Sequence, residues 1–257
     1  QMVGLFINKG PVVQIRDKEG RSQVLADETP GTIYDGPLVV MVNEFSASAS
    51  EIFAAAIQDY KRGIIVGSTS TYGKGTVQRN VSFGKPLDSL GIQTEYGAVK
   101  LTFQKFYRIN GSSTQRKGVA SDIVLPDEYE LFKYRERDNP AALAWDQIQS
   151  SKFQVWNGGY NLDLVKKAYF EHQQKLVDTN NIKFNNNLKA IYTQISKPSY
   201  LKMDKYLAYK KQQQALIKEN DNILKLSEKD AMQVAPIKAD YNKFYNNPDK
   251  PKQERYQ

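Results

Sequence analysis

The pattern of apolar and polar positions changes near residue 140, and the part before it is typical of strands separated by glycine turns. An alternating segment at 10–17 runs into Lys-Glu-Gly and predicts a strand that enters a hairpin. Continuous apolar runs at 36–44 and 63–68 predict strands buried on both faces. Residues 97–111 alternate apolar and polar side chains as far as a glycine turn, which predicts a long strand with one face in water.

A helix is predicted between the two buried strands. Over residues 50–62, apolar side chains recur at helical spacing on one face, at Ile52, Phe53, Ala56, Ile57 and Tyr60. A strand, a helix and a strand in close succession form a βαβ unit, in which the two strands run parallel. The predicted fold class is therefore α/β, with a mixed sheet that contains this unit.

After residue 140, glycine and β-branched residues become fewer and the apolar spacing becomes helical. Amphipathic helices are predicted over 161–178, 181–196 and 203–226. The chain is therefore expected to comprise an α/β domain at 1–140 and an all-helical region at 141–257. Taken by itself, the helical region is interpreted as an appendage that packs on the α/β domain and has no chemistry of its own.

The composition removes several classes of chemistry. Cysteine is absent and His172 is the single histidine, which excludes thiol nucleophiles, disulfide scaffolds, thiolate zinc sites and multi-histidine metal sites. A Ser-His-Asp triad would have to use His172, which lies in a polar stretch of a predicted helix and is interpreted as a solvated residue. Any hydrolytic base is therefore expected to be another residue type, and no metal or organic cofactor is expected.

The net charge of +8 is carried mainly by the second part of the chain, because residues 141–257 contain 19 basic and 12 acidic residues. A basic surface suits nucleic acid, but these lysines are dispersed at helical spacing, with no dense run and no reading motif. They are interpreted as a solvated helical face, so no nucleic-acid partner is expected. No apolar run approaches the roughly 20 residues of a bilayer span, so no transmembrane segment is expected.

The segment Phe-Ser-Ala-Ser-Ala-Ser-Glu at 45–51 allows two interpretations. Ser48 and Glu51 have the spacing of a capping box, in which the serine caps the helix and the carboxylate reaches back to the serine N–H. A serine at a strand-to-helix turn also suits a nucleophile. Taken alone, this stretch favours the helix cap.

The segment Thr-Tyr-Gly-Lys-Gly-Thr-Val-Gln at 71–78 changes that balance. Lys74 lies between two glycines, which let the backbone pass close to another segment. Because the strands of a βαβ unit end on the same side, Ser48 and Lys74 can meet. A lysine activates a serine only as a neutral amine, and apolar surroundings favour that form. Gln78 can orient the amine, and the N–H of Ala49 at the helix start can stabilise an oxyanion.

A phosphate-binding loop is the alternative for this lysine. The pattern fails, because Thr69 occupies the position five residues before Lys74 where the first glycine is required.

Residues 36–78 resemble the core of the C-terminal processing peptidases, also called tail-specific proteases. Residues 105–126 resemble the segment that follows in the larger periplasmic branch of that family, and 139–148 with the helices after it resemble the C-terminal domain of that branch. The resemblance implies a core like those of crotonase and Clp protease. It also implies a Ser/Lys endopeptidase that recognises substrates by free, apolar C-terminal tails. The roles carried over are the nucleophile, the general base, the residue that positions the base, an acidic residue tied to activity and an oxyanion amide, at Ser48, Lys74, Gln78, Asp59 and Ala49.

One residue role carried over from the family has an alternative, and this chain differs from the family pattern in several places. Asp59 is equally well interpreted as a surface charge at a helix end, and the loop before Lys74 is one residue longer than usual. The second oxyanion donor, the PDZ domain and an N-terminal helical region are expected upstream of Gln1, so this chain is expected to be nearly inactive alone. The expected location is the periplasm, either free or at the membrane, with an adaptor as a candidate partner. The alternative function is a non-catalytic binding or scaffold module.

Overall fold

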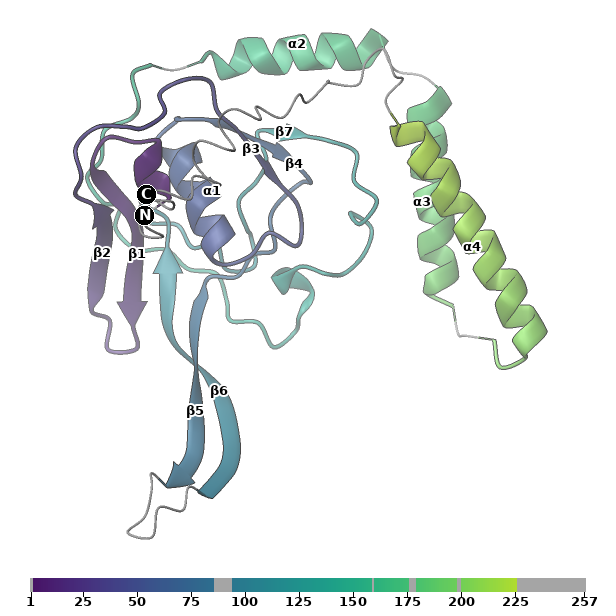
Figure 1. Cartoon of the computed structure of the whole chain (residues 1–257), viewed down its shortest axis with the longest axis horizontal. Coiled ribbons are helices and arrows are strands. Elements are labelled where there is room, and N and C mark those ends of the chain that lie inside the picture. The colour runs from purple at the N-terminus through teal and green to yellow at the C-terminus, as the bar shows by residue number, and fades with distance from the viewer. Residues whose placement is uncertain (1, 86–93, 159, 176–178, 198–199, 226–257) are drawn as a thin grey trace, which may run out of the picture. The chain divides into compact units, whose positions relative to one another are not determined.

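The computed structural model describes residues 2–85, 94–158, 160–175, 179–197 and 200–225 (Figure 1). The chain forms two compact units, 1–197 and 198–257. The first unit extends past the composition change near residue 140, because several described residues between 145 and 156 are bonded to the α/β part. Trp145 donates its indole N–H to the Ser113 carbonyl at 2.9 Å, and Trp156 donates its backbone N–H to the Tyr60 carbonyl at 2.8 Å.

One sheet is antiparallel and has the strand order β2-β1-β6-β5. β1 (Gly10–Asp17) and β2 (Ser22–Asp27) form the predicted hairpin. β5 (Thr76–Lys85) and β6 (Thr94–Tyr107) form a longer ribbon that projects away from the body in Figure 1. The long strand predicted over 97–111 is therefore confirmed, although it begins earlier and ends at Tyr107.

The other sheet is parallel and has the order β3-β4-β7, from β3 (Val39–Val42), β4 (Ile64–Gly67) and β7 (Ile123–Val124). α1 (Ala49–Asp59) connects β3 to β4, which confirms the predicted βαβ unit. Two expectations are corrected. Parallel and antiparallel strands lie in separate sheets, so neither sheet is mixed. β3 is an outer strand, and Val39 and Met41 are 58% and 79% exposed, so this apolar run is not buried on both faces.

The core surrounds α1, because alanines let neighbouring segments approach it closely. Ala54, Ala55 and Ile57 pack with residues of the parallel sheet such as Ile65. Ala56 of α1 and Tyr60, the residue that follows the helix, pack with Val3, Ile7 and Ile109. α1 is therefore held from two sides along its C-terminal half.

The three predicted helices are confirmed as α2 (Leu162–Lys175) and α3 (Thr179–Ile195) in the first unit and α4 (Met203–Leu224) in the second. The helical region begins at Leu162, because the described residues between 141 and 161 contain no helix. His172 is exposed on α2, as predicted. Among the described residues, no helix is both long enough and apolar enough to cross a bilayer.

Candidate active site

Ser48 occupies a strained turn between β3 and α1. It is the N-cap residue of α1, with φ of 58° and ψ of −109°, a region that non-glycine residues rarely adopt. Such a conformation costs about 1–3 kcal/mol and is kept only where the surroundings impose it. The turn before it is fixed by Asn43, whose N–H donates to Ser46 Oγ and whose side-chain oxygen accepts the Phe45 N–H, both at 3.1 Å. The half-buried serine is thus presented at a sharp strand-to-helix turn, a geometry known from serine nucleophiles.

Glu51 joins this turn to the lysine loop. Its side chain is fully buried, and Oε2 accepts the backbone N–H groups of both Ser48 and Lys74 at 2.9 Å. Oε1 accepts the Thr71 hydroxyl at 2.6 Å and the Gly73 N–H at 2.7 Å. The carboxylate half of the predicted capping box is therefore confirmed. Because one oxygen receives both amides, the backbone nitrogens of the two candidate catalytic residues lie within about 6 Å of each other.

The charge state of Glu51 depends on two opposing effects. Burial raises the pKa of Glu51, whereas the hydrogen bonds from Thr71 and from the backbone amides of Ser48, Gly73 and Lys74 oppose that rise. All four partners are donors, which is the arrangement that an ionised carboxylate requires. The sequence assigned Glu51 only to the cap, because its bonds to residues 71–74 cross a gap of twenty residues or more.

Glycines hold the lysine loop against a second segment. Gly73 has φ of 98°, and a side chain at Gly75 would lie 2.7 Å from the backbone nitrogen of Gln115. The N–H of Gly75 donates to the side-chain oxygen of Gln115 at 2.8 Å, and the Thr114 hydroxyl donates to the Lys74 carbonyl at 2.9 Å. The expectation that these glycines permit a close backbone approach is confirmed. The loop is therefore clamped between Glu51 on one side and residues 113–116 on the other.

Lys74 as a whole residue is half-buried. Within the described part of the chain, no carboxylate lies within the 4.0 Å ion-pair distance of its amine. Ala49 begins α1 and is exposed, and helix geometry gives a first-turn amide no carbonyl partner within the helix. The arrangement thus brings together a serine, a lysine that has no counter-charge among the described residues, and a first-turn amide of α1.

Asp59 lies at the other end of α1 from Ser48, about 16 Å away along the helix axis. Its side chain is 5% exposed and forms an ion pair with Arg108, with 2.5 Å between Oδ1 and Nη2. The interpretation of Asp59 as a surface charge is therefore wrong. The structure does not bring its carboxylate to Ser48.

Gln78 also stands apart from the lysine amine. It is exposed on β5, and its amide donates to Thr102 Oγ1 on β6 at 3.4 Å. No hydrogen bond joins it to Lys74 among the described residues. Its role as the residue that orients the base stays a prediction.

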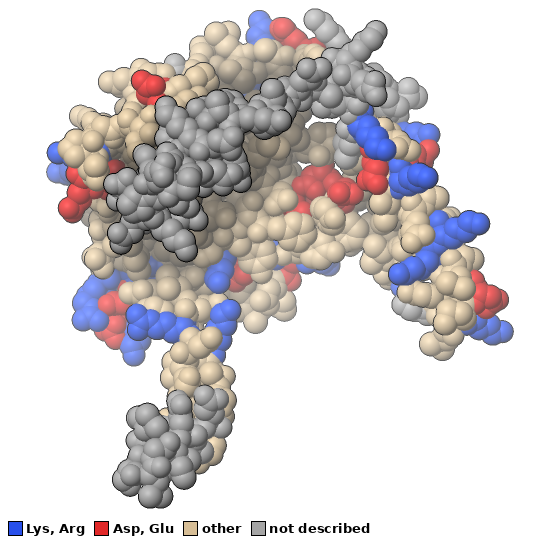
Figure 2. All heavy atoms as spheres, in the orientation of Figure 1, with Lys and Arg blue, Asp and Glu red and all other residues tan. Residues whose placement is uncertain are grey.

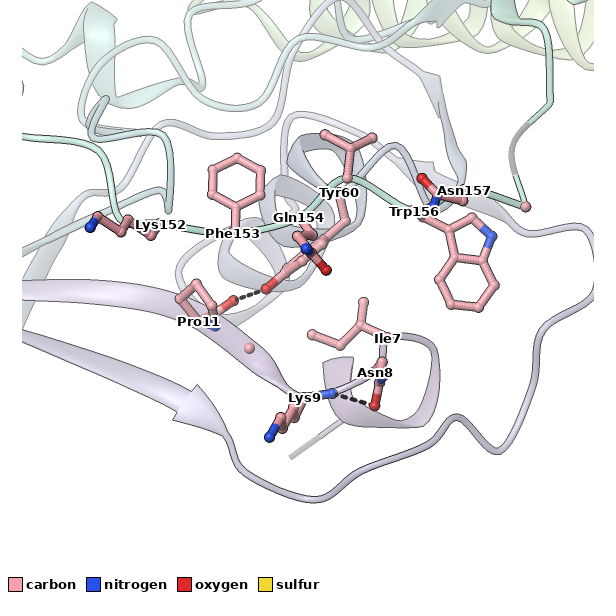
Figure 3. A pocket seen from close by; sticks show the side chains of 13 residues that line it. Ile7, Asn8, Lys9, Pro11, Tyr60, Lys152, Phe153, Gln154, Trp156 and Asn157 are labelled. Atoms are coloured by element: carbon pink, nitrogen blue, oxygen red, sulfur yellow. Dashed lines mark hydrogen bonds between the residues drawn. The ribbon is translucent and has the colours of Figure 1, made fainter.

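A cavity of about 610 Å³ lies beside the C-terminal end of α1 (Figure 3). Tyr60, Phe153 and Trp156 line it together with residues 7–11, and the Tyr60 hydroxyl donates to the Pro11 carbonyl at 2.9 Å. Burial raises the pKa of Tyr60 to about 12, so this hydroxyl stays protonated at neutral pH. None of the candidate catalytic residues lines the cavity, so it is distinct from the site at the start of α1.

The region around Ser48 corresponds to a known peptidase family. Residues 1–125 match the model of peptidase family S41. A peptidase family S41 domain makes up this part of the chain. Over 191 residues the chain is 46% identical to the tail-specific protease of Haemophilus influenzae, a match that covers 73% of this chain and 27% of that protein.

Two further relatives carry related names. The carboxy-terminal processing protease CtpA of Bacillus subtilis is 30% identical over 191 residues, which cover 69% of this chain and 38% of that protein. A solved photosystem II D1 C-terminal processing protease is 32% identical with a TM-score of 0.40, over 48% of this chain and 29% of that chain. The predicted relationship to tail-specific and C-terminal processing proteases is confirmed. The chain spans about a quarter of the Haemophilus protein.

Sequence reasoning also missed Glu44, which lies within the turn that precedes Ser48. Its side chain is fully buried, and neither carboxyl oxygen has a hydrogen-bond partner among the described residues. Burial, with help from the carboxylate of Asp127, raises the pKa of Glu44 to about 7, whereas Arg135 opposes the rise. Glu44 is therefore held largely in its neutral form under mildly acidic conditions.

Glu44→Gln is expected to make stability less dependent on pH. Because the folded-state pKa of about 7 lies above the ordinary value of 4.5, protonated Glu44 favours folding. That contribution is complete below about pH 4.5 and is lost as the pH rises through about 7. The variant should match the wild type near pH 4 and unfold at a higher temperature near pH 8, as measured by thermal unfolding. The exposed Glu28→Gln is the control, and a difference that is constant with pH would contradict the assignment.

Proposed function

We propose that this chain carries the nucleophile and the general base of a Ser/Lys endopeptidase that cleaves polypeptides recognised by apolar C-terminal tails. The observation that carries the proposal is the shared carboxylate oxygen of Glu51, which binds the backbone amides of Ser48 and Lys74 at 2.9 Å each. The strained backbone of Ser48 supports it, because such strain is kept where a turn must present a side chain. The names of the relatives support the substrate class.

The proposed reaction uses this chain's own residues. The neutral amine of Lys74 takes the proton of the Ser48 hydroxyl as the serine oxygen attacks the scissile carbonyl. The N–H of Ala49, strengthened by the helix dipole, stabilises the oxyanion of the tetrahedral intermediate. Lys74 then gives its proton to the leaving amine, and an acyl-enzyme remains on Ser48. Water, deprotonated by Lys74, hydrolyses this ester and restores both residues.

Further parts of the proposal start from the family relationship. Gln78 orients the lysine amine once substrate is bound, since its amide is uncharged and exposed. Asp59 supports activity through the fold rather than by touching substrate, because it is bonded to Arg108. The proposed setting is the periplasm, where an adaptor protein delivers substrates.

The test follows degradation of an unfolded substrate by the full-length protein. The substrate carries either an apolar or a charged C-terminal tail, and the variants are Ser48→Ala and Lys74→Ala. Each variant should lose activity by a factor of about 10³ or more on the apolar-tailed substrate. Ser50→Ala removes an exposed hydroxyl two residues away and should leave the rate unchanged.

Each other outcome has a definite meaning. Cleavage that survives Ser48→Ala would return this serine to the role of helix cap and overturn the proposal. Tail-dependent binding by the wild type without any cleavage would favour the scaffold alternative. Equal rates on both tails would retain the Ser/Lys chemistry and remove the tail preference.

A further inference from the structure

The ribbon of β5 and β6 has both faces in water over much of its length. Its described outer part, residues 78–84 and 96–102, is called the arm here, and every residue in it is exposed. The arm leaves the body of the first unit in Figure 1, and Figure 2 shows tan atoms along it with blue side chains near its root. The strand over 97–111 was predicted to have one face in water, so its second exposed face is a departure that needs an explanation.

The two faces of the arm differ in chemistry. Val81 pairs with Val99 and Arg79 pairs with Leu101, so these four side chains share a face by strand alternation. The exposed fractions on this apolar face are substantial, at 43%, 54%, 38% and 48% for Val81, Phe83, Val99 and Leu101. The opposite face is polar and carries Gln78, Asn80, Ser82, Lys100 and Thr102.

An uncovered apolar face on a two-stranded ribbon is energetically unfavourable. A two-stranded ribbon is marginally stable by itself in water, and a contiguous exposed apolar patch commonly marks a binding surface. β5 is also the outer strand of its sheet, so one of its edges has no strand partner in the described part of the chain. The arm therefore offers both an apolar face and unpaired backbone groups along one strand.

The root of the arm lies at the candidate active site. β5 begins at Thr76, two residues after Lys74. The Gly75 carbonyl accepts the Phe106 N–H at 2.9 Å, so pairing with β6 starts directly after the lysine. The ten residues of β5 then extend about 33 Å. A chain that binds along this strand is led towards Lys74 at one end.

We propose that the arm binds the unfolded polypeptide substrate, which adds as a strand at the free edge of β5 and places alternate apolar side chains on the apolar face. This inference rests on the proposed protease function and names how its substrate is held. Main-chain pairing tolerates many sequences, and alternate side-chain contacts add a preference for apolar segments. Both properties suit a protease whose substrates share an apolar character rather than a fixed cleavage sequence.

Charge favours a substrate over a second copy of this chain. The described side chains of the arm include Arg79 and Lys100 and no acidic residue. Two arms packed against each other would bring like charges together, whereas a neutral or acidic polypeptide would not meet this repulsion. Arg79 already stacks on the ring of Phe103, 4.4 Å from its centroid, which leaves the outer apolar positions free for a ligand.

The experiment compares two substrates in the full-length protein. One is an unfolded protein with an apolar tail, and the other is a peptide of a few residues that is too short to reach from Lys74 along the arm. Val81→Ser with Phe83→Ser should raise KM for the protein substrate at least tenfold, with little change in kcat and no change for the peptide. Asn80→Ala with Ser82→Ala alters the polar face and should leave both substrates unaffected.

Several outcomes would overturn the inference. They are an unchanged KM for the protein substrate, an equal loss on both substrates, or a wild-type dimer that dissociates in the apolar-face variant during sedimentation. Binding of a fluorescent unfolded polypeptide to Ser48→Ala protein, with and without the arm substitutions, tests the arm without turnover. If the wild type cleaves neither substrate, the protease function fails, while this binding measurement still decides whether the arm holds the chain.

Discussion

Glu51→Gln is expected to lower kcat about 100-fold, because it breaks the connection between the serine turn and the lysine loop. Glutamine has the same size but only one acceptor oxygen. Its NH₂ group must face either the amides of Ser48 and Lys74 or the donors of Thr71 and Gly73, all of which lie within hydrogen-bond distance of the carboxylate. Two hydrogen bonds to a charged acceptor are lost, and the free energy of unfolding should fall by about 3 kcal/mol.

The measurement combines kcat on a short peptide with urea unfolding of the same protein. Thr71→Ser keeps the hydroxyl that binds Glu51 and should behave like the wild type, whereas Thr71→Val removes one donor and should give an intermediate loss of kcat. These variants separate positioning from folding, because activity is measured where each protein is fully folded. If Glu51→Gln keeps kcat within threefold of the wild type, the shared carboxylate does not position the two residues.

The local part of this site could be predicted from the sequence. The βαβ rule brings the ends of β3 and β4 to one side, which is why Ser48 and Lys74 were expected to meet. The spacing of Ser48 and Glu51 identified the cap because it involves one helical turn. The hydrogen bonds from the lysine loop to Glu51 and the contacts of that loop with residues 113–116 join positions that are 20 to 40 residues apart. A single sequence carries no periodic signal for such contacts.

Burial was the less predictable property. The apolar run of β3 fits a strand covered on both faces, yet Val39 and Met41 are exposed because β3 is an outer strand. A charged residue at the end of a predicted helix, such as Asp59, is ordinarily exposed. In the fold, Arg108 covers Asp59, although it is 49 positions away in the sequence. Hydrophobic patterning indicates which face is apolar, but the neighbours along the fold decide whether that face is covered.

Asp59→Ala is expected to destabilise the fold by about 3–5 kcal/mol, because it leaves the buried guanidinium of Arg108 without its counter-charge. The side chains of Arg108 and Asp59 are 14% and 5% exposed, and two hydrogen bonds join them. Asn110 also donates to the same carboxylate at 2.8 Å, so one aspartate fixes the end of α1 to the loop after β6. Urea unfolding of wild type and variant measures the loss.

The paired variant Asp59→Leu with Arg108→Met separates a structural role from a catalytic one. Apolar residues of similar size remove both charges together, so most of the stability should return. If Asp59 acts only through the fold, activity should return with stability, because Ser48 lies a helix length away. A paired variant that is stable but inactive would show that the carboxylate itself takes part in the reaction. A loss below about 1 kcal/mol for Asp59→Ala would show instead that the ion pair contributes little to holding α1.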